Sequence, residues 1–391
     1  MMFLEFFTWG TWFVTMGTFL ATELNTDAGS IGTAYMTQAW GAIVAPFIMG
    51  LIADRYFAAQ KLLGVLHLVG AGLLYMAGSS GDFSQFYPYL FIYMIIYMPT
   101  LALVNSVAFK QMTDPAKQFA NVRVWGTIGW IAAGMLIGYV FQWEAKNMLG
   151  STFVLGAIAS AVLGVYSFFL PDTPPPAKGQ KASISDILGL ESLGLLKDRN
   201  YLIFFLASVL ICIPLAFYYS FANAFLNEVG MKNAAGNMTF GQISEVLFML
   251  LLPLFLRKYG LKKTLTVGML AWALRYVLFA FGDVGGNVWM LFLGIIMHGI
   301  CYDFFFVSGQ IFTDHKADEK IRSAAQGLIT LATYGVGMLI GFKVAGVVVD
   351  SYVTMGGHDW QTIWMIPAGF AGAVMLIFLL TFKNETIKLE D

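Results

Sequence analysis

The chain has 391 residues, of which 58% are hydrophobic and 12% are charged, and its formal net charge at pH 7 is -1. A soluble domain carries about 25% charged residues, so this composition excludes a water-soluble globular enzyme and a disordered protein. The near-zero net charge gives no long-range field that would attract nucleic acid. We therefore expect an integral membrane protein without a nucleic-acid partner.

Apolar runs recur along the whole chain, and each is long enough to cross a bilayer, which takes roughly 20 residues. Because the runs are continuous rather than alternating, we expect α-helices. The fold class predicted is an all-α membrane protein with twelve spans in two six-helix bundles. We place the spans at 3–22, 30–53, 61–78, 86–109, 122–141, 151–170, 200–226, 239–256, 263–281, 287–312, 324–349 and 361–382.

The longest polar interval runs from Pro171 to Asn200 and divides the spans six and six. We predict an N-terminal bundle over 1–170, a linker over 171–199 and a C-terminal bundle over 200–391. A short amphipathic helix is expected over 183–196. Eighteen Lys and Arg residues lie in the even-numbered connections and the C-terminal tail, against only Lys146 and Lys232 in the odd-numbered ones. This bias places the linker and both termini in the cytoplasm.

A turn after span two resembles the turn after span eight. Residues 50–56 and residues 253–260 each lead through basic side chains into the next span. Six plus six spans with such a turn resemble the major facilitator superfamily, whose halves are repeats. The alternative is a small-residue helix end followed by a solvated charged turn.

Span five carries polar side chains on one helix face. Arg123, Thr127 and Trp130 are spaced i, i+4 and i+7. A guanidinium, a hydroxyl and an indole on one stripe suit a polar, planar ligand. The alternative is an Arg123 side chain that reaches the interface and a Trp130 ring that packs on a neighbouring helix.

Acidic side chains at membrane depth are the second candidate feature, because an ionised group there costs on the order of 2.5–3.5 kcal/mol. Span eight places Gln242 and Glu245 on one face, and span ten places Asp303 beside His298 and Tyr302. Both carboxyl groups can be neutralised by a proton, so Glu245 and Asp303 are the candidate proton-coupling residues. The alternative for either is a structural ion pair with Arg275, whose role stays open.

Span seven places Tyr219 and Asn223 four residues apart, a spacing that also fits ordinary packing. Lys343 in span eleven has no assigned role. Cys212 and Cys301 lie in apolar runs, so neither a disulfide nor a metal site is expected. We find no phosphate-binding loop, catalytic constellation or metal-ligand spacing, and therefore predict no cofactor and transport driven by an ion gradient.

Six motifs occur in chain order: Tyr97-Met98-Pro99-Thr100-Leu101, Arg123-Val124-Trp125-Gly126-Thr127-Ile128-Gly129, Gln242-Ile243-Ser244-Glu245, Asp303-Phe304-Phe305 with Ser308-Gly309, Ala325-Gln326-Gly327, and Asp359-Trp360-Gln361-Thr362. Together they resemble the bacterial nucleoside:proton symporter family. The resemblance implies a major facilitator fold that carries a nucleoside with protons, and that Arg123, Thr127, Gln242, Glu245 and Asp303 line the central cavity. We also expect a monomer in the bacterial inner membrane.

The chain also departs from the family pattern. Trp130 stands where a smaller aromatic is expected, His298 and Tyr302 stand for Tyr and Phe, and two amide positions of span seven are Ala216 and Tyr219. The lost amides leave a sugar or a modified nucleoside open as the substrate. Two further classes are a membrane solute sensor without transport and an intramembrane enzyme. The sequence contains neither the effector domain that would support the sensor nor the catalytic constellation that the enzyme would need.

Overall fold

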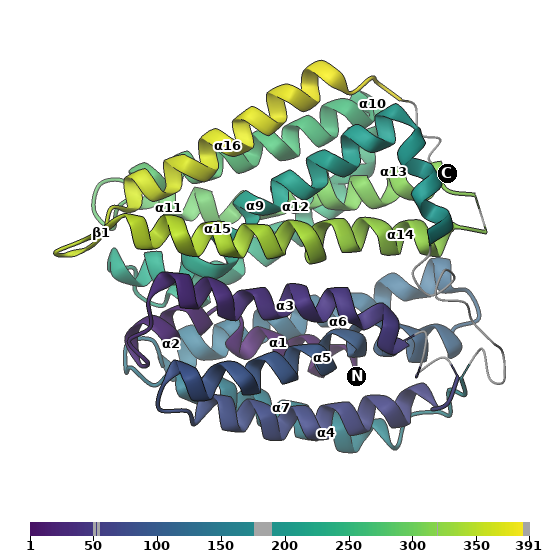
Figure 1. The fold of residues 1–391 in the computed structure, drawn as a ribbon, viewed down its shortest axis with the longest axis horizontal. Coiled ribbons are helices and arrows are strands. Elements are labelled where there is room, and N and C mark those ends of the chain that lie inside the picture. Colours follow the sequence, from purple (N-terminus) through teal and green to yellow (C-terminus); the bar gives the residue numbers. More distant parts are fainter. Residues whose placement is uncertain (50–51, 53–54, 176–189, 319, 386–391) are drawn as a thin grey trace. The chain divides into compact units, whose positions relative to one another are not determined.

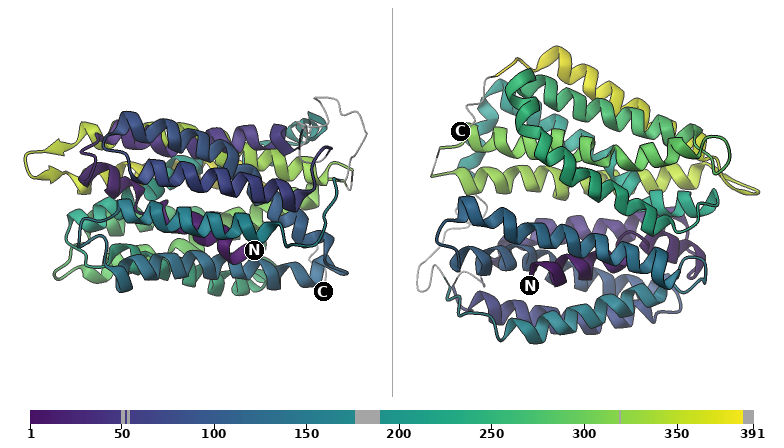
Figure 2. Two further views of the ribbon diagram at one scale, coloured as in Figure 1. Left: turned by 90° about the horizontal axis from the view of Figure 1, so that it is seen from below. Right: turned by 180° about the vertical axis from the view of Figure 1, so that it is seen from behind.

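The computed structural model describes the whole chain except residues 50–51, 53–54, 176–189, 319 and 386–391. Nearly all of the described part is helical, and the only strands in it are the two-residue β1 (Val353–Thr354) and β2 (Gly357–His358). These strands pair antiparallel, with Val353 opposite His358, just before the last helix. The chain divides into two compact units (Figures 1 and 2). The first comprises residues 1–188 with 232–236, and the second residues 189–231 with 237–391.

The first unit contains the six N-terminal spans. Its helices are α1 (Met2–Trp12), α2 (Met16–Thr22), α3 (Ala28–Ile48), α4 (Ala59–Gly78), α5 (Phe83–Lys110), α6 (Pro115–Met135), η2 (Leu136–Phe141) and α7 (Gly150–Ser167). Within this unit α4 packs along α7 and α5, while α1 packs along α6 and α7. The first predicted span is therefore built from two helices, α1 and α2, and the fifth continues from α6 into the π-helix η2.

The second unit contains the remaining spans. Its helices are η3 (Leu190–Lys197), α9 (Arg199–Glu228), α10 (Ala234–Phe281), α11 (Val288–Ile296), α12 (His298–Tyr302), η4 (Asp303–Val307), α13 (Ser308–Lys316), α14 (Arg322–Thr330), η5 (Leu331–Gly337), α15 (Met338–Ser351) and α16 (Trp360–Thr381). The long α10 holds two predicted spans, because Gly260 (φ 77°) turns the chain between them in the left-handed region that glycine favours. Spans ten and eleven each contain a π-helical segment, η4 and η5.

The described residues hold nine helical segments that are long and apolar enough to cross a membrane. Their outward faces are apolar too: Leu250, Leu254 and Leu380 are 73%, 62% and 85% exposed. Contiguous apolar surface of this kind is stable against hydrocarbon and not against water. The helices thus expose the side chains that a bilayer solvates.

Aspartates begin four of the helices. Asp27, Asp82, Asp198 and Asp359 stand at the N-caps of α3, α5, α9 and α16, and each accepts a hydrogen bond from a backbone N–H of the first turn. Hydrogen bonds from Ser84 and Gln85 hold the pKa of Asp82 below its ordinary value. Each aspartate pairs with a backbone N–H group that the helix itself leaves free, so it sets the residue at which the helix begins.

Two predictions fall partly outside the described residues. The first copy of the repeated turn includes residues 50–51 and 53–54, and the predicted amphipathic helix over 183–196 begins in the segment that is not described. The described part of this predicted helix belongs to η3 (Leu190–Lys197), which is a 3-10 helix rather than an α-helix.

Candidate functional site

In the second unit, α10 and α12 approach each other backbone to backbone. A Cβ atom at Gly299 would lie 2.6 Å from the carbonyl carbon of Ser244 and 2.7 Å from the backbone nitrogen of Glu245. The Ser244 hydroxyl donates to the carbonyl oxygen of Ile296 at 2.6 Å and accepts from the Gly299 N–H at 3.1 Å. Glycine at 299 therefore sets the distance between the helices that carry Glu245 and His298.

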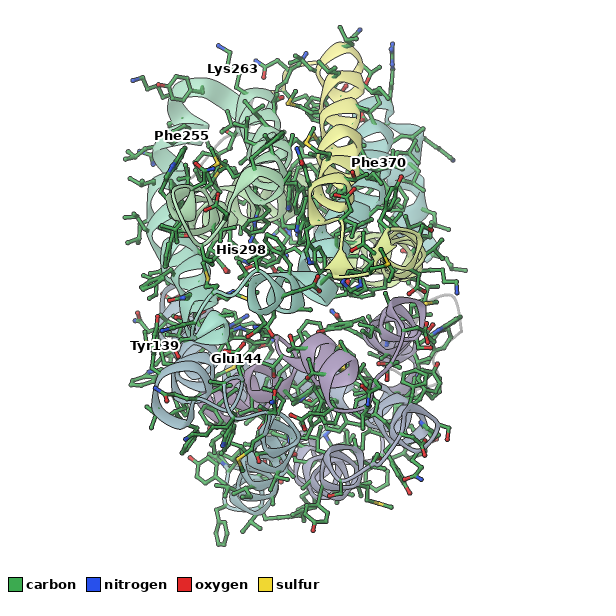
Figure 3. The ribbon with its side chains drawn as sticks, turned by 90° about the vertical axis from the view of Figure 1, so that its left-hand side faces the viewer. Tyr139, Glu144, Phe255, Lys263, His298 and Phe370 are labelled. Atoms are coloured by element: carbon green, nitrogen blue, oxygen red, sulfur yellow. The ribbon has the colours of Figure 1, made fainter. Side chains whose placement is uncertain are left out.

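This approach brings Glu245, His298 and Arg275 together. His298 Nε2 lies 3.9 Å from Glu245 Oε2, and His298 Nδ1 lies 3.1 Å from Arg275 Nη1. Because a guanidinium only donates, His298 Nδ1 must accept this hydrogen bond. The neutral imidazole then carries its hydrogen on Nε2, which faces Glu245. His298, which Figure 3 labels among the helices of this unit, thus links a fixed cation to a carboxyl group.

The Arg275 side chain is fully buried, and its partners differ from those considered in the sequence. Its guanidinium carbon lies 3.5 Å from the centre of the Tyr218 ring. Its Nη1 atom bonds to His298, whereas Nε and Nη2 have no hydrogen-bond partner within the described part of the chain. A buried cation on an aromatic face gains about 2 kcal/mol or more when it is desolvated. Arg275 is thus held by a ring and an imidazole, and among the described residues the Asp303 carboxyl oxygens do not accept a hydrogen bond from it.

Asp303 is 0% exposed and begins the π-helix η4. Neither of its carboxyl oxygens has a hydrogen-bond partner among the described residues. Single π-helical turns are found frequently at functional sites, because they rotate side chains away from the regular helical pattern. A carboxyl group in this environment is far more costly as an anion than as a neutral acid.

Aromatic side chains lie close to His298. The Tyr302 and Tyr334 hydroxyls are 2.5 Å apart, which joins η5 to the end of α12. The His298 ring lies 5.3 Å from the Tyr218 ring and 5.8 Å from the Tyr302 ring. Tyr219 is half-buried beside Tyr218. Aromatic rings and phenol hydroxyls close to a buried imidazole are suited to an uncharged ligand that has both a flat ring and hydroxyl groups.

Three further residues of this unit that the sequence singled out are Asn223, Gln242 and Lys343. Asn223 is buried, with its Nδ2 3.8 Å from Met238 Sδ, and Asn227 donates to its Oδ1 at 3.3 Å. Gln242 is half-buried on α10, one turn before Glu245. Lys343 is exposed on α15 near the exposed Val344 and Val347, apart from the buried cluster.

In the first unit, the predicted face of span five lies on α6 against α1. The Arg123 guanidinium carbon lies 4.1 Å from the centre of the Phe6 ring, and Thr127 is half-buried one turn further along. The Trp130 ring packs edge to face on Trp9 at 5.5 Å. The half-buried Trp130 indole thus contacts α1, and Arg123 and Thr127 keep partly exposed polar groups.

The family model for the nucleoside H+ symporter matches residues 1–387. The putative nucleoside transporter YegT of Escherichia coli is 44% identical to the chain, over all of the chain and 95% of the relative. The chain belongs to the nucleoside H+ symporter family. The xanthosine permease of Escherichia coli is 33% identical over 98% of the chain and 94% of its own length. The crystal structure of nucleoside transporter NupG superimposes with a TM-score of 0.87 at 33% identity, covering 98% of each chain.

These relationships confirm the predicted family and the major facilitator fold. They also confirm the prediction of a transporter rather than an enzyme, because the family and its solved relative are transporters. Within the described residues, no three His, Cys, Asp or Glu side chains gather as a metal site would require.

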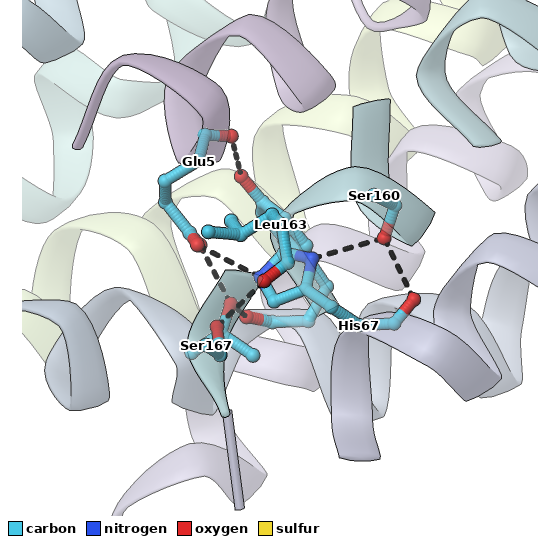
Figure 4. Close-up of polar contacts among 7 residues, drawn as sticks. Glu5, His67, Ser160, Leu163 and Ser167 are labelled. Carbon is cyan, nitrogen blue, oxygen red and sulfur yellow. Dashed lines mark hydrogen bonds and ion pairs between the residues drawn. The ribbon is translucent and has the colours of Figure 1, made fainter. Parts of the chain in front are cut away.

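Sequence reasoning missed a second buried polar cluster, which lies in the first unit (Figure 4). Glu5 on α1 and His67 on α4 are 0% and 1% exposed, and Glu5 Oε2 lies 2.8 Å from His67 Nε2. Ser160 on α7 lies 2.9 Å from His67 Nδ1, and Thr100 on α5 donates to Glu5 Oε1 at 2.6 Å. The signal in the sequence was an acid in one apolar run and a histidine in another.

Proposed function

We propose that the chain imports a nucleoside together with protons across a bacterial inner membrane by alternating access. The moving parts are two bundles, residues 1–170 and 200–391, joined by a linker over 171–199. The Lys and Arg bias of the sequence supports a cytoplasmic position for the linker and both termini. The working unit of the proposal is a monomer. The substrate-binding residues of the proposal are Arg123, Thr127, Trp130, Tyr219, Asn223, Gln242, Glu245, His298, Tyr302 and Asp303.

Asp303 is the observation that carries the proton-coupled part of the proposal. Its carboxyl group is fully buried, and both oxygens lack a hydrogen-bond partner among the described residues. Such a group is stable as a neutral acid and becomes an anion only when water or a ligand reaches it. A change of access during transport therefore moves a proton on and off Asp303. Glu245, which faces the Nε2–H of His298, is the second acid whose charge such a change affects.

The substrate class follows from the chemistry of the proposed binding residues. Arg123, Glu245 and Asp303 can hold ribose hydroxyls by charge-assisted hydrogen bonds, and the rings of Tyr219 and Tyr302 can stack on a base. Relatives named for nucleosides and for xanthosine support a nucleoside as substrate.

A sugar remains the second candidate, because the two amide positions of span seven are changed. Ala216 is fully buried, and its Cβ lies 2.7 Å from where a Cβ on Gly341 would stand. An amide at 216 would have no room there, so the change at Tyr219 is the one that alters hydrogen bonding to the ligand. Uptake of labelled adenosine, cytidine, xanthosine, ribose and sucrose separates the two candidates. Preference for a sugar over every nucleoside overturns the nucleoside proposal.

The proton role is tested with Asp303→Asn in proteoliposomes under an imposed pH gradient. We expect the variant to equilibrate the nucleoside across the membrane without accumulating it, because an amide cannot release a proton. Asp283→Asn is the matched control, since Asp283 lies in an exposed turn of the same unit. Accumulation by Asp303→Asn at the level of the control would refute the coupling role of Asp303.

A further inference from the structure

The Glu5–His67 pair is the feature of the structure that the proposed function leaves unused. It joins helices from three parts of the first unit: Glu5 lies on α1, His67 on α4 and Ser160 on α7. Both members of the pair are fully enclosed by protein. An acid and a base that contact each other at this depth, away from Asp303 and Glu245 in the chain, need an account of their own.

The hydrogen bonds around Ser160 fix which ring nitrogen of His67 carries a hydrogen. Ser160 Oγ lies 2.9 Å from the carbonyl oxygen of His67 and 2.9 Å from His67 Nδ1. A carbonyl oxygen only accepts, so the Ser160 hydroxyl must donate to it. The Ser160 oxygen is then the acceptor for a hydrogen on Nδ1.

With Nδ1 protonated, the contact between His67 Nε2 and Glu5 Oε2 must contain a further proton. If Glu5 is a neutral acid, it donates to the Nε2 lone pair; if Glu5 is an anion, Nε2–H donates to it. Both arrangements hold one proton between the two atoms, and both leave the pair with no net charge. Without that proton a carboxylate would face a lone pair at 2.8 Å, which is repulsive.

The surroundings hold the Glu5 carboxyl group in place. The Thr100 hydroxyl lies 2.6 Å from Oε1 and 2.6 Å from the Tyr97 carbonyl oxygen, and the Tyr97 hydroxyl donates to the Glu5 carbonyl oxygen at 2.9 Å. Other titratable or charged groups near the pair are the amino group of Met1, the phenols of Tyr97 and Tyr93 on α5, and the guanidinium of Arg123 on α6, which covers the Phe6 ring. Neither Tyr93 nor Arg123 takes a proton from the pair under physiological conditions, since a phenol is neutral and a guanidinium stays charged.

We propose that Glu5 and His67 form a second proton-binding site of the transporter, which takes up one proton onto the Oε2–Nε2 axis and releases it during the cycle. This inference rests on the proposed proton-coupled function. Release of the proton makes the contact repulsive, so the end of α1 that carries Glu5 must separate from α4 when the site empties. Occupancy of the site is in this way tied to the packing of α1 inside the first unit.

Proton and nucleoside fluxes measured together in proteoliposomes test the site. Glu5→Gln keeps the shape and both hydrogen bonds, because the amide donates to His67 Nε2 and accepts from Thr100, but it cannot exchange a proton. We expect the variant to move one proton fewer per nucleoside, and its accumulation under one unit of pH gradient to fall about tenfold. Glu23→Gln is the matched control, since Glu23 is also a carboxylate of the first unit but binds the backbone of Gly150 at a helix start.

The outcomes separate this site from the proposed function. If the wild type moves no protons with nucleoside, the proposed function fails. If the wild type couples and Glu5→Gln keeps the wild-type proton ratio and pH profile, the second site is refuted while the function stands. Should Glu5→Gln fail to give a monodisperse protein, His67→Gln is measured in the same way. As a readout independent of flux, pH-difference infrared spectra of the wild type should contain a carboxyl signal that is absent in Glu5→Gln or in a folded His67→Gln.

Discussion

Replacement of Gly299 by alanine tests whether the α10–α12 contact controls the site. The added methyl carbon would lie 2.6 Å from the Ser244 carbonyl carbon, whereas ordinary contacts begin at 3.4 Å, so the two backbones must separate by about 0.8 Å. Overpacking against backbone atoms costs about 1–3 kcal/mol. Because the nearest atoms include the Glu245 nitrogen, the shift also moves the Glu245 carboxyl group relative to His298.

The assay combines thermal unfolding in detergent with nucleoside uptake. We expect Gly299→Ala to lower Tm and to raise KM for the substrate. Gly369→Ala is the matched control, because Gly369 lies in α16 with no atom within 4 Å of its Cβ position. Alanine there should leave uptake unchanged and raise stability by up to about 1 kcal/mol, as the helix propensities predict. If Gly299→Ala had the Tm and KM of the wild type, the two backbones would separate without loss of stability or substrate affinity. That result would refute the role given to this contact.

Two further changes probe the second unit. Tyr302→Phe removes one hydroxyl of the 2.5 Å pair with Tyr334; we expect a loss of about 1 kcal/mol in substrate affinity or stability, and a double-mutant cycle with Tyr334→Phe should return a coupling of similar size. Asp198→Asn weakens the cap of α9, where hydrogen bonds from the Tyr201 N–H and from Lys316 lower the pKa of Asp198. A carboxyl group whose pKa is lower in the folded state contributes stability above its unfolded pKa, so the Tm difference between wild type and Asp198→Asn should be constant above about pH 5 and shrink as the pH falls below about 4. A Tm difference that grows in acid would contradict the assignment.

The sequence predicted the elements that depend on composition alone. The apolar runs predicted spans over 86–109 and 361–382, and the structure has helices over Phe83–Lys110 and Trp360–Thr381. The break at Gly260 lies between predicted spans eight and nine, where a glycine and basic residues interrupt the run. These features are local, so a single stretch of sequence contains their physical cause.

The partners of the buried groups could not be predicted in this way. Arg275 had several possible neighbours, and its contact with Tyr218 depends on how α9 and α10 are rotated against each other. Glu5 and His67 are 62 residues apart, and nothing local to either one specifies their contact. The π-helix at Asp303 breaks the 3.6-residue period on which helix-face predictions depend. Sequence reasoning thus found Arg275, Glu245 and Asp303 as costly side chains but missed Glu5 and His67, and tertiary packing decided what compensates each of them.

The two histidines at membrane depth illustrate how that compensation produces different proton chemistry from the same pair of residue types. In the first unit Ser160 makes Nδ1 of His67 a donor, so the Nε2 contact with Glu5 requires a shared proton. In the second unit Arg275 makes Nδ1 of His298 an acceptor, so Nε2 carries a hydrogen toward Glu245 whether or not that acid is ionised. The imidazole of His298 therefore stabilises an anion at Glu245 and does not compete for its proton, whereas His67 shares the proton of Glu5. A serine or an arginine behind the ring, rather than the acid in front of it, determines which of the two roles each histidine takes.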